Sequence, residues 1–343
     1  MGGCIMSLVP MRQILREAQK GGYGVGAFNV NNMEQLQAIT EAAAETNSPV
    51  IIQVSRNALK YAGDDLLAAM VIHQATRKFP RIPMALHLDH GPDVPTCLRC
   101  IALGFTSVMI DGSLDYAKKI AKGYAPADFA ANVAVTRQVV ELAHMAGVTV
   151  EGEIGTLGGI EDEVESETHL TDPNEAKAFV DQTGVDALAL AIGTSHGAHK
   201  APKGKPIVLA LDLIDEIEQM CPLVAKVMHG SSSVPQYMID EVNKYGGQIA
   251  DASGVPTAMI QDAIKRGMCK INIDTDGRLA ITAAIRKVLV ESPQKFDPRD
   301  YLGPARAAAK AWIIEEMKAF GTAGHASDYA PMTCADMAAS YAK

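Results

Sequence analysis

Three histidines follow apolar segments of the kind that form buried strands. His90 ends the segment MALHLDH, His196 ends ALALAIGTSH, and His229 ends the segment 223–229. Histidine is the commonest metal ligand, and a three-histidine zinc site leaves its fourth coordination position open for a substrate. One histidine at a strand end is more often structural, but three at different strand ends make coincidence the weaker explanation. We therefore expect a single divalent metal ion held by His90, His196 and His229.

The elements that must position these histidines alternate between strands and helices. Short runs rich in apolar and β-branched residues are separated by helical stretches such as 32–46, 126–146 and 276–289. Strands joined by helices of this length form right-handed βαβ units, and eight of them close into a (β/α)8 TIM barrel. In such a barrel the chemistry lies at the carboxyl ends of the strands. The expected strands are 24–30, 50–55, 84–90, 107–111, 148–154, 187–192, 223–229 and 270–273.

Two segments lie outside this repeat. Residues 155–171 form a Gly- and Glu-rich loop after the fifth strand, long enough to be a functional loop. Residues from about 293 to 343 form a C-terminal helical extension, with a helix from roughly 304 to 320. Because no Gly/Ser-rich or Pro-rich linker interrupts the chain, we expect residues 1–343 to form a single barrel domain with this extension.

The composition excludes several classes of protein. The net charge of −9 lacks the basic excess of a nucleic-acid-binding protein, although an acidic protein can still bind an anion locally. No run approaches the roughly 20 apolar residues of a membrane helix, and the first residues do not resemble a secretory signal. The six cysteines do not suggest a disulfide scaffold, and the single pair Cys97 and Cys100 indicates two helix-face thiols. We expect a cytoplasmic protein that binds neither nucleic acid nor membrane.

The residues next to His90 suggest proton transfer. Strand alternation places His87 and Asp89 on one face of the strand and His90 on the other. Asp89 then lies beside the metal without having to bind it. A carboxyl group there can carry a proton or can orient an imidazole, and both roles remain open.

Small polar residues at three strand ends favour an anion site. Residues 231–233 are three serines after His229 and Gly230, residues 193–195 precede His196, and residues 272–275 end the last strand and begin a helix. Loops after the seventh and eighth strands, together with a helix N-terminus, form the usual phosphate site of this barrel. Each segment is weak evidence alone, but together they predict a phosphate site.

A series of motifs runs in order along the chain: AFNVNN at 27–32, PVIIQVS at 49–55, HLDHG at 87–91, GFTSVMIDGS at 104–113, EGEIGTLGGIED at 151–162, AIGTSHGAHK at 191–200, VMHGSSSVP at 227–235, KINIDTDGRLA at 270–280 and FDPRDYL at 296–302. On these motifs the chain resembles the class II, metal-dependent fructose-bisphosphate aldolases, and in particular their Calvin-cycle subgroup. The resemblance runs from about residue 24 to residue 324. It differs from some members in having Ile160 before Glu161 instead of a second glutamate, and its 155–171 loop is shorter, which leaves the subtype open.

The resemblance implies a metal-dependent aldol reaction in the glycolytic, gluconeogenic or Calvin-cycle direction. The metal, usually zinc, would act as a Lewis acid on the enediolate of dihydroxyacetone phosphate. Asp89 would exchange a proton with the C4 hydroxyl, and Glu161 would remove the C3 proton. Asp111 and Glu153 match positions that hold a second or displaced metal, or that support the first.

The resemblance also implies how sugar phosphates are bound. Asn29 and Ser55 would line the substrate pocket. Arg299 would reach the aldehyde-side phosphate of a neighbouring subunit, so we expect a homo-oligomer, a dimer or tetramer. The ketone-side phosphate, helped by a monovalent cation (Na⁺ or K⁺), would be held by Gly197, Gly230, Ser232, Asn272, Asp274 and Thr275.

Four alternatives remain open. A tagatose-bisphosphate aldolase shares the barrel and the metal and differs in C4 stereochemistry. A Schiff-base aldolase needs a buried lysine, for which Lys226 and Lys270 are candidates only by position. A metal hydrolase commonly has an HxH pair on the first strand, which here ends without histidine. A non-enzymatic scaffold would leave the polar strand ends unexplained.

Overall fold

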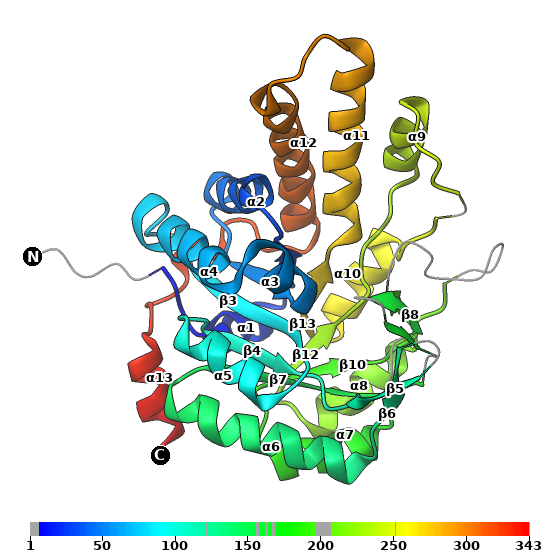
Figure 1. Ribbon diagram of the computed structural model, residues 1–343. Coiled ribbons are helices and arrows are strands. Elements are labelled where there is room, and N and C mark those ends of the chain that lie inside the picture. Colours follow the sequence, from blue (N-terminus) through cyan, green and yellow to red (C-terminus); the bar gives the residue numbers. More distant parts are fainter. Residues whose placement is uncertain are drawn as a thin grey trace, which may run out of the picture.

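Eight parallel strands close into a barrel in a computed structural model of the chain (Figure 1), which confirms the predicted fold class. The structure describes residues 7–120, 123–155, 158–161, 164–166, 169–196, 207–250 and 252–342. Each strand pairs with the next along the chain, and β13 closes the barrel against β1. The barrel strands are β1 (Val25–Asn29), β2 (Val50–Ser55), β3 (Met84–Gly91), β4 (Ser107–Ile110), β7 (Thr149–Ile154), β10 (Ala187–Leu190), β12 (Ala225–Met228) and β13 (Met268–Ile273).

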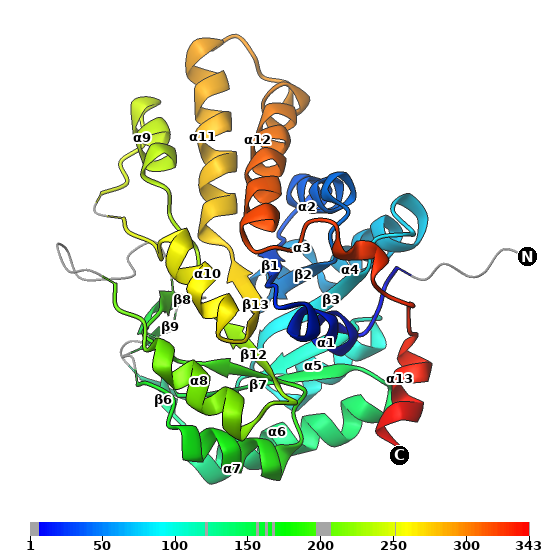
Figure 2. The same ribbon diagram turned by 180° about the vertical axis from the view of Figure 1, so that it is seen from behind.

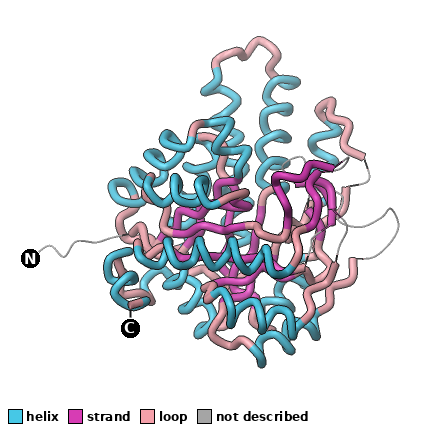
Figure 3. The backbone as a smooth tube through the Cα atoms, turned by 60° about the horizontal axis from the view of Figure 1, so that its bottom comes forward, coloured by secondary structure: helices cyan, strands magenta, loops and turns pink. Residues whose placement is uncertain are grey.

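Helices surround the strands on the outside of the barrel (Figure 3). Many begin where the sequence offers an oxygen to cap the first turn: the side chains of Asn32, Asp93, Asp128 and Asp172 each accept a backbone N–H. The helices are α2 (Met33–Thr46), α3 (Arg56–Ala62), α4 (Asp64–His73), a π-helical turn Gln74–Lys78, α5 (Val94–Ala102), α6 (Phe129–Met145), α7 (Pro173–Thr183), α8 (Leu211–Met220), α9 (Gln236–Lys244), α10 (Thr257–Lys265) and α11 (Thr275–Glu291).

The amino end of the barrel is closed by helix α1 (Met11–Gly21) (Figure 2). Its residues Met11, Ile14, Leu15 and Ala18 form one apolar stripe and pack with Ala27, Ile51, Ala85, Met109 and Val227 inside the barrel. The C-terminal helix α13 (Cys334–Tyr341) lies beside this end. A short 3-10 turn, His325–Ser327, precedes it.

The barrel interior becomes more polar towards the carboxyl ends of the strands. On β3 the inward face carries Ala85, His87 and Asp89 in that order, because successive side chains of a strand alternate. On β7 the same face carries Thr149, Glu151 and Glu153. The apolar layer nearest α1 therefore supports a layer of buried ionisable groups at the carboxyl end.

Two sequence predictions need correction. Segment 155–171 is not only loop, because it holds β8 (Gly158–Glu161) and β9 (Val164–Ser166), which join β11 (Ser195–His196) in a small sheet. The C-terminal helix α12 (Pro298–Ala319) begins at Pro298 and not near residue 304. Asp297 caps it and a proline occupies its first turn, which are usual features of a helix start. Pro304 therefore lies inside the helix. A hairpin of β5 (Leu114–Ile120) and β6 (Gly123–Pro126) was not anticipated.

No helix in the described ranges has the length and apolarity needed to cross a membrane.

Candidate active site

His90 and His229 meet at the carboxyl end of the barrel. His90 Nε2 lies 3.1 Å from His229 Nδ1, although β3 and β12 are on different sides of the barrel. Simple alternation would point His90 away from Asp89, and that prediction is wrong. His90 has a left-handed φ of 48°, and the pairing of β3 with β4 shifts register between Leu88 and Gly91. This irregular turn brings the imidazole to the inner side.

Asp111 fixes the orientation of His90. His90 Nδ1 lies 3.1 Å from Asp111 Oδ2, directly after β4. Burial alone would raise the pKa of Asp111, but the bonds from His90, Ser113 and Tyr116 lower that pKa to about 2. An ionised carboxylate only accepts, so Nδ1 of His90 is the donor, and the other ring nitrogen, Nε2, faces His229.

Glu151 plays the same part for His229. His229 Nε2 lies 2.8 Å from Glu151 Oε1, and Lys270 Nζ lies 2.9 Å from the other oxygen of that carboxylate. Burial opposes ionisation of Glu151, but Lys270 and His229 hold its pKa well below the usual range. Burial lowers the pKa of His229 to about 4. His229 is therefore neutral near pH 7, with Nε2 donating and Nδ1 free of a proton.

The two imidazoles thus turn one ring nitrogen each towards the other, and with neither nitrogen protonated this arrangement fits a metal ion. Two nitrogens bound to one tetrahedral zinc at about 2.05 Å stand roughly 3.3 Å apart, close to the separation seen. Carboxylates that orient metal-binding histidines are the usual support of such sites. The ligand atoms of Asp89, His90 and His229 lie within 4.8 Å of one another, and those of His90, Asp111 and Glu153 form a second such group.

Three predicted residues fall partly outside the described part of the chain. His196 is the last residue of β11 and Glu161 the last of β8, and the register pairs β11 with β8. Their side chains, and the whole of Gly197, lie outside the described residues. The backbone positions place both chain segments on one small sheet.

The predicted phosphate residues converge on the N-terminus of α11. Ser232 Oγ lies 3.2 Å from the backbone N of both Asp274 and Thr275, at the first turn of that helix. Gly230 has a φ of 63°, and a Cβ there would meet the Ser195 carbonyl oxygen at 2.5 Å. Glycine is therefore required at position 230, where the two loops touch. The N-terminus of α11, a few residues away in space, favours an anion.

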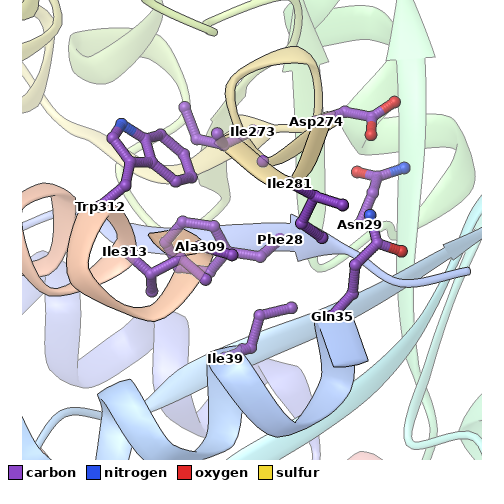
Figure 4. Close-up of a pocket in the computed structure, with 11 residues that line it drawn as sticks. Phe28, Asn29, Gln35, Ile39, Ile273, Asp274, Ile281, Ala309, Trp312 and Ile313 are labelled. Atoms are coloured by element: carbon purple, nitrogen blue, oxygen red, sulfur yellow. The ribbon is translucent and has the colours of Figure 1, made fainter. Parts of the chain in front are cut away.

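Asn29, Ser55 and Asn272 also lie at this end, on β1, β2 and β13. Asn29 accepts from Gln53 Nε2 at 3.0 Å, and Ser55 caps α3. Behind Asn29 is a cavity of about 20 Å³, lined by apolar side chains around Trp312 with Asn29, Gln35 and Asp274 at one end (Figure 4). That space holds about one water, so it is not the site for a sugar phosphate.

Arg299 is not brought to the other predicted residues within one chain. It lies at the start of α12, and α11 and α12 form a hairpin that projects from the barrel (Figure 1). A helix of 17 residues such as α11 spans about 25 Å. The Arg299 side chain is 89% exposed and pairs with Asp297.

The two lysines of the Schiff-base alternative have other partners. Lys226 is paired with Glu218 of α8 and with the Cys221 carbonyl. Lys270 is paired with Glu151 beneath His229. Both ammonium groups are held against carboxylates, so neither nitrogen is placed to attack a carbonyl.

Known proteins match the chain over almost its full length. A family model described as class-II fructose-bisphosphate aldolase matches residues 9–325. The fructose-bisphosphate aldolase of Giardia intestinalis is 52% identical over 324 residues, covering 94% of this chain and 96% of that protein. The class 2 enzyme of Synechocystis sp. is 49% identical, covering 98% and 96%.

The chain belongs to the class II fructose-bisphosphate aldolases.

This aldolase also shares its fold with solved relatives. The crystal structure of the YdjI aldolase from Escherichia coli K12 superposes with a TM-score of 0.73 at 28% identity, covering 93% of this chain and 100% of that one. The resemblance seen in the sequence is confirmed, and the aldolase is a lyase that acts on fructose bisphosphate. Nothing in these relatives favours the tagatose alternative.

Sequence reasoning missed three residues that build this aldolase's site. Glu151 orients His229, Tyr116 donates to Asp111 at 2.9 Å, and Asp276 accepts from the backbone N of Ser233 and Val234. For Glu151 a signal existed, since an acid inside an otherwise apolar barrel strand must be paired. Tyr116 and Asp276 act through contacts between distant segments, which no local pattern indicates.

Proposed function

We propose that His90, His196 and His229 bind one zinc ion, and that this aldolase uses it to split D-fructose 1,6-bisphosphate reversibly into dihydroxyacetone phosphate and glyceraldehyde 3-phosphate. The observation that supports this most is the facing pair of His90 Nε2 and His229 Nδ1, each imidazole backed by a buried carboxylate. When bound, the metal would supply a Lewis acid that stabilises negative charge developing on the ketone oxygen.

The protein's own groups would move the protons. Asp89 is fully buried and belongs to the same cluster as the two imidazoles, so it is placed to exchange a proton with the C4 hydroxyl. Glu161 at the end of β8 would remove and return the C3 proton.

The phosphates would bind at opposite ends of the substrate. The N-terminus of α11, with Ser232, Asp274 and Thr275, suits the ketone-side phosphate, because Ser232 lies against the first N–H groups of the helix. Gly197, Gly230 and Asn272 would complete this end with a monovalent cation, Na⁺ or K⁺. Asn29 and Ser55 would line the middle of the pocket.

The aldehyde-side phosphate would need a second copy of the chain. Phe296 is 90% exposed at the end of the α11–α12 hairpin, and Leu289 and Val290 are exposed near it. Exposed apolar residues around Arg299 favour a homo-oligomer, a dimer or tetramer, in which Arg299 completes the site of a neighbour. The chain would then act as a single barrel domain with its extension from about residue 293.

Two further expectations belong to this proposal. Asp111 and Glu153 would support His90, and they would become ligands of a displaced metal only if Asp111 gave up its present partners. The five cysteines in the described ranges are all free thiols, which suits the reducing cytoplasm. The resemblance to the family implies a role in glycolysis, gluconeogenesis or the Calvin cycle.

The decisive experiment strips the protein with EDTA and reloads it with zinc or cobalt before a coupled assay on fructose and tagatose bisphosphates. We expect activity to vanish on stripping, to return on reloading and to favour fructose bisphosphate. Borohydride with substrate should leave the enzyme active. Activity that survives the chelator but is lost on reduction would overturn the metal proposal.

A further inference from the structure

Asp111 is saturated with hydrogen bonds. Its Oδ1 accepts from the Ser113 hydroxyl at 2.6 Å and the Ser113 backbone N–H at 3.2 Å. Its Oδ2 accepts from the Tyr116 hydroxyl at 2.9 Å and from His90 at 3.1 Å. An ionised carboxylate offers about four lone-pair positions. While these donors stay in place, Asp111 orients His90 and has no position left for a metal ion.

The Tyr116 ring is held in place by a cation–π contact and by a neighbouring aromatic ring. The Arg56 guanidinium lies over the rings of Tyr116 and Tyr124, at 5.4 and 5.9 Å, and the two rings are 4.8 Å apart. A cation over aromatic faces is attracted to them. The Tyr116 hydroxyl is the donor of the bond to Asp111, because a carboxylate oxygen accepts.

The position of Tyr116 matters because His90 belongs to two possible ligand groups. One contains Asp89 and His229, and the other contains Asp111 and Glu153. His90 is shared, so the availability of the Asp111 oxygens decides between them. The Tyr116 hydroxyl occupies the oxygen of Asp111 that also faces His90.

We propose that Tyr116 is a positioning residue of the metal centre, whose hydroxyl keeps Asp111 as the acceptor that orients His90 and prevents it from becoming a metal ligand. Arg56 and the β5–β6 hairpin hold that hydroxyl in place. The inference rests on the proposed metal site and deepens it. It assigns a role to a hairpin that lies outside the barrel repeat.

The test compares Tyr116→Phe with Tyr124→Phe in the full-length protein. Each change removes one hydroxyl from the same pair of tyrosine rings. The Tyr116 hydroxyl donates to Asp111, whereas in the described part of the chain no hydrogen bond involves the Tyr124 hydroxyl. Competition with a chelator gives the zinc dissociation constant of each variant. Visible absorption of the Co²⁺-loaded protein reports the coordination geometry. Thermal unfolding of the metal-free protein gives its melting temperature.

We expect Tyr116→Phe to weaken zinc binding about tenfold, the low end for residues that support metal ligands. Its Co²⁺ absorption should weaken as Asp111 joins the ligands and the site leaves tetrahedral geometry. The metal-free melting temperature should stay that of the wild type, and Tyr124→Phe should match the wild type throughout. If Tyr116→Phe does not fold, Ser113→Ala releases the other Asp111 oxygen and should show the same changes to a lesser degree.

Three results would overturn the inference. Tyr116→Phe could show wild-type zinc affinity and spectrum, Tyr124→Phe could show an equal loss, or Ser113→Ala could be silent when Tyr116→Phe does not fold. A wild-type chain that takes up no zinc would instead overturn the proposed function together with this inference. The wild-type titration therefore separates the two failures.

Discussion

The two ends of the barrel both bury charged groups, but they hold these groups in different ways. At the amino end Asp186 accepts from the side chains of Arg12, His144 and Tyr341, at 3.2, 3.0 and 2.8 Å, and from the Val150 backbone N–H at 2.9 Å. The His144 and Tyr341 rings are stacked with centroids 3.6 Å apart. This network holds α13 against the barrel, and its role is therefore structural.

The carboxyl end has imidazole nitrogens that face each other and backbone that is strained. Among the described residues other than glycine, three have positive φ, and two of them, His90 and Val234, lie at this end. Val234 is β-branched, so its φ of 44° costs energy, and Asp276 holds it by accepting its N–H at 2.8 Å. The amino-end network around Asp186 therefore serves stability alone, whereas the carboxyl end combines stability with function.

The largest effect on activity at the carboxyl end should come from Asp89→Asn. The amide keeps the size of the side chain but cannot carry the proton, so kcat should fall roughly a hundred- to ten-thousand-fold. The melting temperature and zinc content should stay near those of the wild type. A coupled assay with zinc analysis checks this, and a loss of less than tenfold would remove Asp89 from the mechanism.

Glu151→Gln should affect both function and stability, because Glu151 serves His229 and Lys270 together. Zinc affinity should fall about 10- to 100-fold as His229 loses its acceptor. The free energy of unfolding should fall by about 3 kcal/mol, because Lys270 keeps a buried charge without its partner.

The double variant Glu151→Gln with Lys270→Met is the control for that prediction. Urea unfolding should show most of the stability restored, while chelator competition should show zinc affinity still reduced. Recovery of both together would mean that Glu151 does not orient His229.

Asp186→Asn is the matching change at the amino end. It removes the charge from a carboxylate that is 3% exposed and bonded to four donors, so unfolding should become easier by about 2 kcal/mol. Both kcat and KM should be unchanged once the protein is folded, and Tyr341→Phe should cause a smaller loss of stability. A change in kcat from either variant would show that the two ends are coupled.

The sequence predicted the repeating and local features of this molecule well. The eight strands were placed within a few residues, because apolar β-branched runs between capped helices have few other readings. Alternation correctly placed Asp89 with His87 inside the barrel, but it could not show the left-handed turn at His90. That turn depends on a register shift against β4, which is a tertiary feature.

The amino-end network could not be predicted for a related reason. Arg12, His144, Asp186 and Tyr341 are far apart along the chain and share no pattern. Only the closure of the barrel brings them together. Motif reasoning therefore found the reactive end, where residues follow strand ends in order, and missed the end that secures the fold.

The smallest effect concerns Glu316 on α12, a buried acid that belongs to neither end. It is 6% exposed, and within the described residues its Oε2 accepts no hydrogen bond. Burial and the negative charge of Asp276 raise its pKa to about 8. Tyr237 of α9 is a titratable group that feels the charge of both carboxyls.

The sign of the pH dependence follows from this raised pKa. The folded protein holds the Glu316 proton more tightly than the unfolded chain does, so this carboxyl destabilises the fold increasingly as pH rises from about 4.5 to about 8. Between pH 7 and 9 the expected loss is about 1 kcal/mol, since the effect levels off above pH 8. Glu316→Gln should remove that slope in urea unfolding, whereas Glu315→Gln, whose side chain is 70% exposed beside Lys318, should keep it. Equal slopes in Glu316→Gln and the wild type would show that Glu316 is already ionised in the folded protein near pH 7.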